Sequence, residues 1–106
     1  MRLGVVGMMP ADFRDITTDH LRAIADLQLT GAACHAPIAG LGDVTSAQCA
    51  AVRSTVEAAG MDFVQFGLGF SQCLFDPDPA VVAPLLTGVA RGIEGAAELQ
   101  AHYCLI

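Results

Sequence analysis

The sequence predicts an α/β fold built on a parallel sheet, with strands and helices in the order βαβαβαβ. Short apolar segments alternate with longer segments whose apolar residues have helical spacing. The first three units begin near Leu3, Ala32 and Phe63, a spacing close to the roughly 30 residues of a βαβ unit. The composition agrees, because 54% of the residues are hydrophobic and 15% are charged, as in strands buried on both faces. With 106 residues, the chain has room for one domain.

The first unit is a short strand followed by a helix. Leu3–Gly7 is a short apolar run that ends at glycine and predicts the strand. Thr17 is a good N-cap for the helix that follows, in which Leu21 and Ile24 lie on one face. Gly31 lies where a C-terminal cap would sit, so we expect the helix to end there.

The second unit has the clearest helix start in the sequence. Ala32–His35 predicts a short strand that Pro37 stops. Thr45–Gln48 has the pattern of a capping box, in which each of its end residues can bond the backbone amide of the other. Gly60 is placed to cap the end of this helix, and the β-forming residues of Phe63–Gly67 predict the third strand.

The last helix and strand follow a loop. Asp78 is a suitable N-cap and Pro79 then occupies the first helical position. Pro84 and three glycines are expected to weaken this helix, and Pro84 to kink it. His102–Ile106 predicts a fourth strand. The apolar stripe of the helix consists of Val82, Leu85, Leu86, Val89, Ile93, Ala96 and Ala97.

The charge balance argues against several classes of partner. Eleven acidic residues stand against five basic ones, all of them Arg, and the net charge is −6. This balance predicts that the chain binds neither nucleic acid nor anionic membranes. The absence of Lys also excludes a phosphate-binding P-loop and Schiff-base chemistry.

The sequence also bears on the compartment. Its four cysteines form no C-x-x-C pair, so we expect small buried hydrophobic residues in a reduced, cytoplasmic protein. The longest uncharged run, Leu27–Gly42, is interrupted by polar residues and glycines, and no membrane span is expected. The N-terminus looks partly like a signal peptide, but Asp12 and Arg14 follow at once, so we favour a buried strand.

Four segments of the chain resemble a known family. Met1–Pro10, Ile16–Leu21, Val64–Gly67 and Cys73–Pro79 together resemble the sugar phosphate isomerase/epimerase family, whose members are xylose isomerase-like TIM barrels. The resemblance covers essentially the whole chain, but only about the first three and a half of that family's eight βα units. It therefore implies the N-terminal half of a TIM (β/α)8 barrel, with residues 1–106 as a single partial domain. The chain stops at the end of a predicted strand, which agrees with a fragment or half of an assembly.

The resemblance implies a function in carbohydrate metabolism. Such enzymes move a hydrogen between adjacent carbons of a sugar, and many use a divalent metal (Mn, Mg, Co or Zn). In the family, Glu, Asp and His at the ends of later strands hold that metal. No acidic residue ends a predicted strand here, so we assign no catalytic residue, metal ligand or cofactor to this chain. The chain alone is expected to be inactive and to contribute to the sugar-binding pocket of a complete barrel.

Two polar residues are the candidates for substrate binding. His35 ends the second predicted strand, at the face where TIM barrels build their active sites. Gln65 lies in an otherwise apolar strand and could line the barrel interior. The alternative for each is a hydrogen bond within the protein. His20 is expected to be solvated and His102 to serve stability, while Cys34 should point away from His35 and cannot pair with it.

Two other functions stay open. A non-catalytic half-barrel could bind a ligand or assemble, either with a second copy or with a missing C-terminal half, since an open sheet leaves edges that invite pairing. A small flavodoxin-like domain would instead bind an anionic ligand where its strand order reverses.

Overall fold

Four strands form one parallel sheet, in the order β1-β2-β3-β4. The computed structural model describes residues 3–106, and the side chains of all of these except residues 38 and 39. The strands are β1 (Gly4–Val5), β2 (Gly31–Pro37), β3 (Asp62–Gly69) and β4 (Tyr103–Leu105). The helices are a 3-10 turn η1 (Phe13–Asp15), α1 (Thr18–Ala25), α2 (Ile38–Leu41), α3 (Ser46–Ala58) and α4 (Pro79–Glu98).

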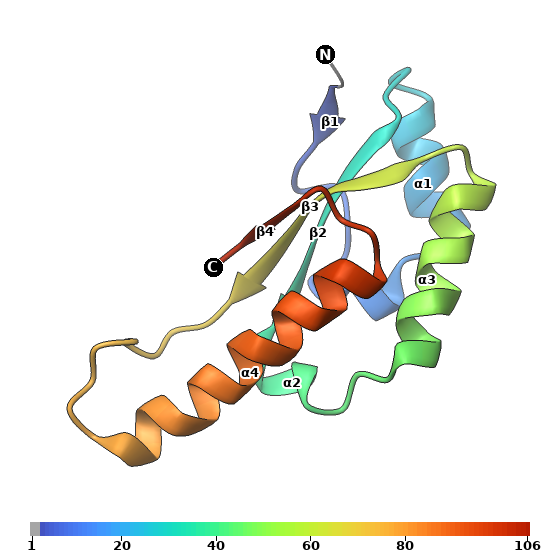
Figure 1. The fold of residues 1–106 in the computed structure, drawn as a ribbon. Helices are drawn as coiled ribbons and strands as arrows, with labels where there is room; N and C mark the ends of the chain where they lie inside the picture. Colours follow the sequence, from blue (N-terminus) through green and yellow to red (C-terminus); the bar gives the residue numbers. More distant parts are fainter. Residues whose placement is uncertain (1–2) are drawn as a thin grey trace.

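Each strand pairs with the strand that precedes it in the chain, and the helices lie to one side of the sheet (Figure 1). This is the arrangement of consecutive βα units in a barrel, in which helices form an outer ring around the strands. The predicted α/β fold and its half-barrel architecture are confirmed. A flavodoxin-like sheet reverses its strand order and carries helices on both faces, so that alternative is wrong.

The helix starts agree with the sequence, and one predicted helix end is wrong. Thr17 caps α1 as expected, and its backbone N–H donates to Nδ1 of His20 at 3.1 Å, so His20 is part of the cap rather than simply solvated. The helix ends at Ala25, and Gly31 is the first residue of β2 instead of a cap. The residue that adopts a left-handed backbone conformation after α1 is Gln28, at φ 59°, so the turn that ends this helix does not use a glycine.

Helix α3 has the predicted caps at both ends. The hydroxyl of Thr45 accepts from the amide of Gln48 at 3.2 Å, and the side chain of Gln48 accepts from the amide of Thr45 at 3.0 Å. Gly60 follows the helix with a φ of +72°, a left-handed conformation that glycine adopts without strain. The short segments η1 and α2 were not predicted, because neither is long enough to show helical periodicity.

Helix α4 is continuous over 20 residues, although Pro84 and several glycines lie in it. Asp78 caps its start by accepting from the amide of Ala80 at 2.9 Å. Glycines that weaken a helix can be favourable where two elements pack closely. A methyl group at Gly92 would lie 2.5 Å from Cδ1 of Leu68 on β3, so the absence of a side chain is what allows α4 to lie this close to the sheet.

The core lies between the helices and the sheet. Phe13 of η1 and Phe66 of β3 are fully buried there, and their rings meet edge to face with centroids 5.3 Å apart. Arg91 ties α4 to the segment before α3, because its Nη2 donates to the carbonyl oxygen of Val44 at 3.0 Å and to Glu98 at 3.1 Å.

By length and composition, α4 could cross a membrane, whereas no membrane span was expected from the sequence. Its buried residues Leu85, Gly88, Gly92 and Gly95 pack toward the sheet, and Arg91 in the same helix is ion-paired.

Candidate functional site

The sheet has an inner face, which we define as the face opposite the helices. Alternate residues of a strand point to opposite faces, and Cys34 and Phe66 are fully buried on the helical side. Their neighbours along β2, β3 and β4 therefore make up the inner face. These inner-face residues are Ala33, His35, Gln65, Gly67, Tyr103 and Leu105.

His35 lies on this inner face near the carboxyl end of β2, which continues two residues beyond the predicted strand end at His35. It is half-buried and stands directly beside Gly67 of β3 in the sheet register. A methyl group at Gly67 would lie 2.5 Å from Cδ2 of the His35 ring. The imidazole therefore extends sideways across β3.

Gln65 lies on the same face, two positions before Gly67 along β3. It pairs with Ala33 on one side and with Tyr103 on the other. The structure thus brings the two predicted residues, His35 and Gln65, to neighbouring strands of one surface. Within residues 3–106, neither of these two side chains has a hydrogen-bond partner.

The other two histidines are already engaged. His20 accepts a backbone hydrogen bond in the cap of α1. His102 precedes β4, and its Nε2 lies 3.1 Å from Oδ2 of Asp62 at the start of β3. Asp62 and His102 border a cavity of about 220 Å³ at the amino end of the strands, and in TIM barrels the residues at that end serve stability. Among the described histidines, His35 is the one whose ring has no hydrogen-bond partner within residues 3–106.

The inner face does not fit a metal ion. Across the part of the chain that the structure describes, no three His, Cys, Asp or Glu side chains come close enough to hold one. His35 is the single side chain of metal-ligand type among the six inner-face residues given above, and none of them is a carboxylate. The described residues do not make a metal site by themselves.

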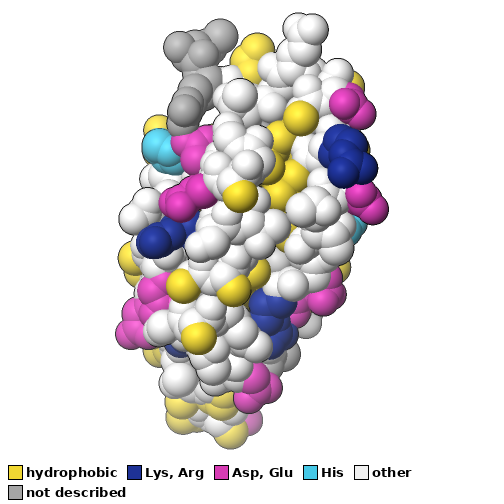
Figure 2. Space-filling model, turned by 90° about the vertical axis from the view of Figure 1, so that its right-hand side faces the viewer, with side chains coloured by type: hydrophobic (Ala, Val, Ile, Leu, Met, Phe, Trp, Pro, Cys, Tyr) yellow, Lys and Arg dark blue, Asp and Glu magenta, His cyan; other side chains and the backbone are white. Residues whose placement is uncertain are grey.

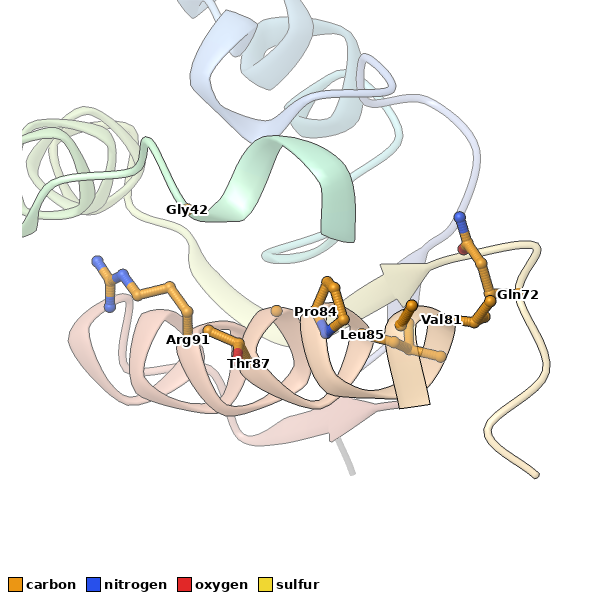
Figure 3. A pocket seen from close by; sticks show the side chains of 9 residues that line it. Gly42, Gln72, Val81, Pro84, Leu85, Thr87 and Arg91 are labelled. Carbon is orange, nitrogen blue, oxygen red and sulfur yellow. The ribbon is translucent and has the colours of Figure 1, made fainter. Parts of the chain in front are cut away.

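A larger cavity lies on the helical side, away from His35 and Gln65. It is a surface groove of about 590 Å³ along α4, with Arg91 at one end, Gln72 at the other and Gly42 facing the helix (Figure 3). Its lining is mainly apolar, and its one charged group, Arg91, already donates to Val44 and Glu98. The groove therefore offers no charged group for catalysis.

The cysteines differ in exposure. Cys34 and Cys49 are buried as predicted, whereas Cys104 is half-buried and Cys73 is exposed, which corrects the expectation for those two residues. Burial raises the pKa of the Cys34 thiol strongly and that of Cys49 to about 11, so neither is a nucleophile at neutral pH. Cys34 and His35 lie on opposite faces, as expected, and form no catalytic pair.

The charged side chains of the helical surface are mixed rather than clustered. Figure 2 shows the side of the molecule that carries α1 and α3, where acidic and basic groups alternate with apolar ones. Arg22 lies 3.1 Å from Asp19, and Arg53 lies 3.4 Å from Glu57. The expectation that the chain binds no nucleic acid stays a prediction.

Comparison with known proteins supports the fold alone. No protein-family model matches the chain, and no curated protein sequence matches it. A solved structure of D-psicose 3-epimerase, determined in the presence of D-fructose, is similar with a TM-score of 0.70 and 19% sequence identity. The similarity covers 98% of this chain and 36% of the epimerase chain, so this chain spans about a third of that protein.

Two inner-face residues escaped the sequence analysis, Gly67 and Tyr103. Gly67 was predicted to end the third strand and was given no role, whereas β3 continues to Gly69. Alternation along β3 from the buried Phe66 places Gly67 on the inner face, whereas the place of Tyr103 depends on the register between β3 and β4.

Proposed function

We propose that this chain forms part of the substrate-binding wall of a barrel that isomerises or epimerises a sugar. The observation that carries this proposal is the pair formed by His35, near the carboxyl end of β2, and Gln65, in the middle of β3, whose free polar groups share the inner face. TIM barrels bind their substrates at the carboxyl ends of their strands. The structural similarity to D-psicose 3-epimerase supports the choice of a sugar as ligand.

The chemistry of His35 and Gln65 suits neutral hydroxyl groups. An imidazole and a primary amide can each donate and accept, as hydroxyl groups also do. Polar groups that lie partly buried without a partner are favourable positions for a ligand to satisfy. In this proposal the two residues bind and orient the sugar, and they transfer no proton.

The proton transfer would depend on groups outside this chain. The family resemblance implies a divalent metal held by later strands, and the inner face described above offers no carboxylate. We therefore expect the purified chain to produce no D-psicose from D-fructose, with or without added Mn²⁺. Turnover would contradict this assignment. We also propose a cytoplasmic location, because none of the four cysteines forms a disulfide with another.

Nuclear magnetic resonance can test the binding proposal on the 106-residue chain. D-fructose added to the ¹³C,¹⁵N-labelled protein should shift the ring signals of His35 and the side-chain amide signals of Gln65 until they saturate. His35→Ala and Gln65→Ala should each weaken binding about tenfold, the effect of losing about one hydrogen bond. His102→Ala is the matched control, since His102 lies at the opposite end of the strands.

The proposal fails under two outcomes. One is the absence of any saturable shift on the inner face. The other is binding that His35→Ala and Gln65→Ala leave as strong as His102→Ala does. Shifts confined to the groove along α4 would place the ligand elsewhere and would also contradict the proposal.

The free edges of the sheet favour a second candidate, an assembly module. In the described sheet, β1 and β4 each pair on one side only. Beside the β4 edge, Tyr103, Leu105 and Ile106 are 67%, 52% and 60% exposed, and such apolar edges favour pairing with another strand. A second copy or a C-terminal half of the barrel would be the partner. Light scattering should then show a dimer that Leu105→Lys dissociates, whereas a monomer at all concentrations would exclude self-pairing.

A further inference from the structure

The glycine at position 67 is not required by its backbone. Only a φ between about +20° and +160° excludes ordinary side chains, and Gly67 lies outside that range, whereas Gly7 and Gly60 lie within it. It sits inside a regular strand, between Phe66 and Leu68, where glycine is unfavourable. Another constraint therefore accounts for the missing side chain.

That constraint is the ring of His35. A methyl group at Gly67 would lie 2.5 Å from Cδ2 and 2.8 Å from Nε2 of this imidazole, closer than non-bonded atoms approach. Gly69, two residues further along β3, has no such contact, because a methyl group there would meet nothing within 4 Å. The bare backbone of Gly67 is thus the surface on which the imidazole lies.

Tyr103 completes the same area of the inner face. It pairs with Gln65, while Leu105 pairs with Gly67 on the next inner-face position. His35, Gln65 and Tyr103 therefore lie on three successive strands around one glycine. Tyr103 is 67% exposed, and its hydroxyl and ring have no hydrogen-bond partner within residues 3–106.

These groups match a molecule that has both hydroxyl groups and an apolar face. The imidazole and the amide offer hydrogen bonds in two directions, and the phenol ring offers a flat apolar surface with a polar tip. None of the six inner-face residues carries a fixed positive charge that would bind a phosphate or carboxylate. The combination suits a neutral sugar with one face of C–H groups.

We infer that Gly67 is a positioning residue for His35 and that Tyr103 is a third binding residue, so that the site takes a neutral sugar stacked on Tyr103. This inference rests on the proposed function, since it refines the same site. Gly67 acts through His35 and does not touch the sugar itself. Tyr103 contacts the sugar through its ring, and the phenol hydroxyl is dispensable.

The first test compares Gly67→Ala with Gly69→Ala. The methyl group at residue 67 should displace the imidazole, shift the Hδ2 signal of His35 and weaken D-fructose binding at least tenfold. The methyl group at residue 69 should change neither. Both variants should keep the dispersed amide spectrum of the folded chain. Unchanged His35 signals in a folded Gly67→Ala protein would overturn the positioning role.

The second test concerns Tyr103 and the ligand class. Tyr103→Phe should bind D-fructose as tightly as the wild type does, whereas Tyr103→Ala should bind it at least tenfold more weakly. The wild-type chain should bind D-fructose 6-phosphate no more tightly than D-fructose. Equal binding by Tyr103→Ala, or tighter binding of the phosphate, would overturn the assignment. If the wild-type chain binds no sugar while Gly67→Ala still displaces His35, the proposed function fails and the positioning role stands.

Discussion

The close packing of α4 on the sheet can be tested with two glycines of the same helix face. Gly92 and Gly95 are both buried in α4, and replacing either by Ala should gain about 1 kcal/mol of helix propensity. A methyl group at Gly95 has room, since its nearest neighbour would be Cε1 of Phe66 at 4.0 Å. Gly95→Ala should therefore raise the free energy of unfolding by about 1 kcal/mol.

At Gly92 the same substitution meets an obstacle. The new methyl group would lie 2.5 and 2.6 Å from the two Cδ atoms of Leu68 and 3.1 Å from Cδ1 of Leu41. Both leucines are buried, so they have little space into which to move. Overpacking of this kind costs about 1–3 kcal/mol, which equals or exceeds the gain in helix propensity.

The two variants should thus differ by about 1–3 kcal/mol in their free energy of unfolding, with Gly95→Ala the more stable. The comparison cancels the effect of the substitution on the unfolded chain, because both variants replace the same residue type in the same helix. Urea denaturation followed by circular dichroism measures the difference as a shift in midpoint at constant slope. Equal stabilities, or a more stable Gly92→Ala, would refute the close packing described for α4.

Three further effects follow from local contacts. Thr45→Ala should cost about 1 kcal/mol of stability in urea denaturation, because it removes the cap of α3. The pKa of Glu98 is lowered because Arg91 donates hydrogen bonds to its carboxylate. The pair therefore stabilises the fold fully at pH values above the ordinary carboxyl pKa of 4.5, and this stabilisation is lost as the pH falls through the lowered pKa of Glu98. Glu98→Gln should be less stable than the wild type at pH 7, and the difference should disappear in acid. With a thiol reagent, Cys73 should react first, the half-buried Cys104 more slowly, and the buried Cys34 and Cys49 only on unfolding, so Cys73→Ser should remove the fast phase.

Each of these three effects has a clear contradicting result. Thr55 lies inside α3, so a loss for Thr45→Ala no larger than that for Thr55→Ala would show that the cap contributes nothing specific. A stability difference between wild type and Glu98→Gln that is the same at pH 7 and in acid would exclude the ion pair as its cause. A fast thiol phase that persists in Cys73→Ser would mean that another cysteine is accessible in the folded chain.

Local signals account for the parts of the fold that the sequence predicted. The caps at Thr45 and Asp78 depend on residues only two or three positions away, so the sequence contains all that is needed to recognise them. The end of α1 was mistaken because Gln28, a residue with a side chain, adopts the left-handed conformation for which a glycine was expected.

The inner face depended on information that the sequence did not display. Phe63 and Phe66 are both buried in the core although they are three positions apart, which strict alternation along a strand forbids. The register shift between β2 and β3 solves this, since β3 has an extra residue, Val64, between the partners of Ala32 and Ala33. Such a bulge is a property of two strands together, and it decides on which face Gln65 lies.

The sequential order of the strands also has a consequence for how the chain folds. Every strand pairs with its predecessor in the sequence, so no pairing has to wait for a distant segment. During synthesis, β2 and β3 can join as soon as Gly69 has emerged from the ribosome, and α4 and β4 can then add to a sheet that already exists. The order of synthesis and the order of assembly are therefore the same, and a circular permutation that separates β2 from β3 should slow folding far more than one that separates β3 from β4.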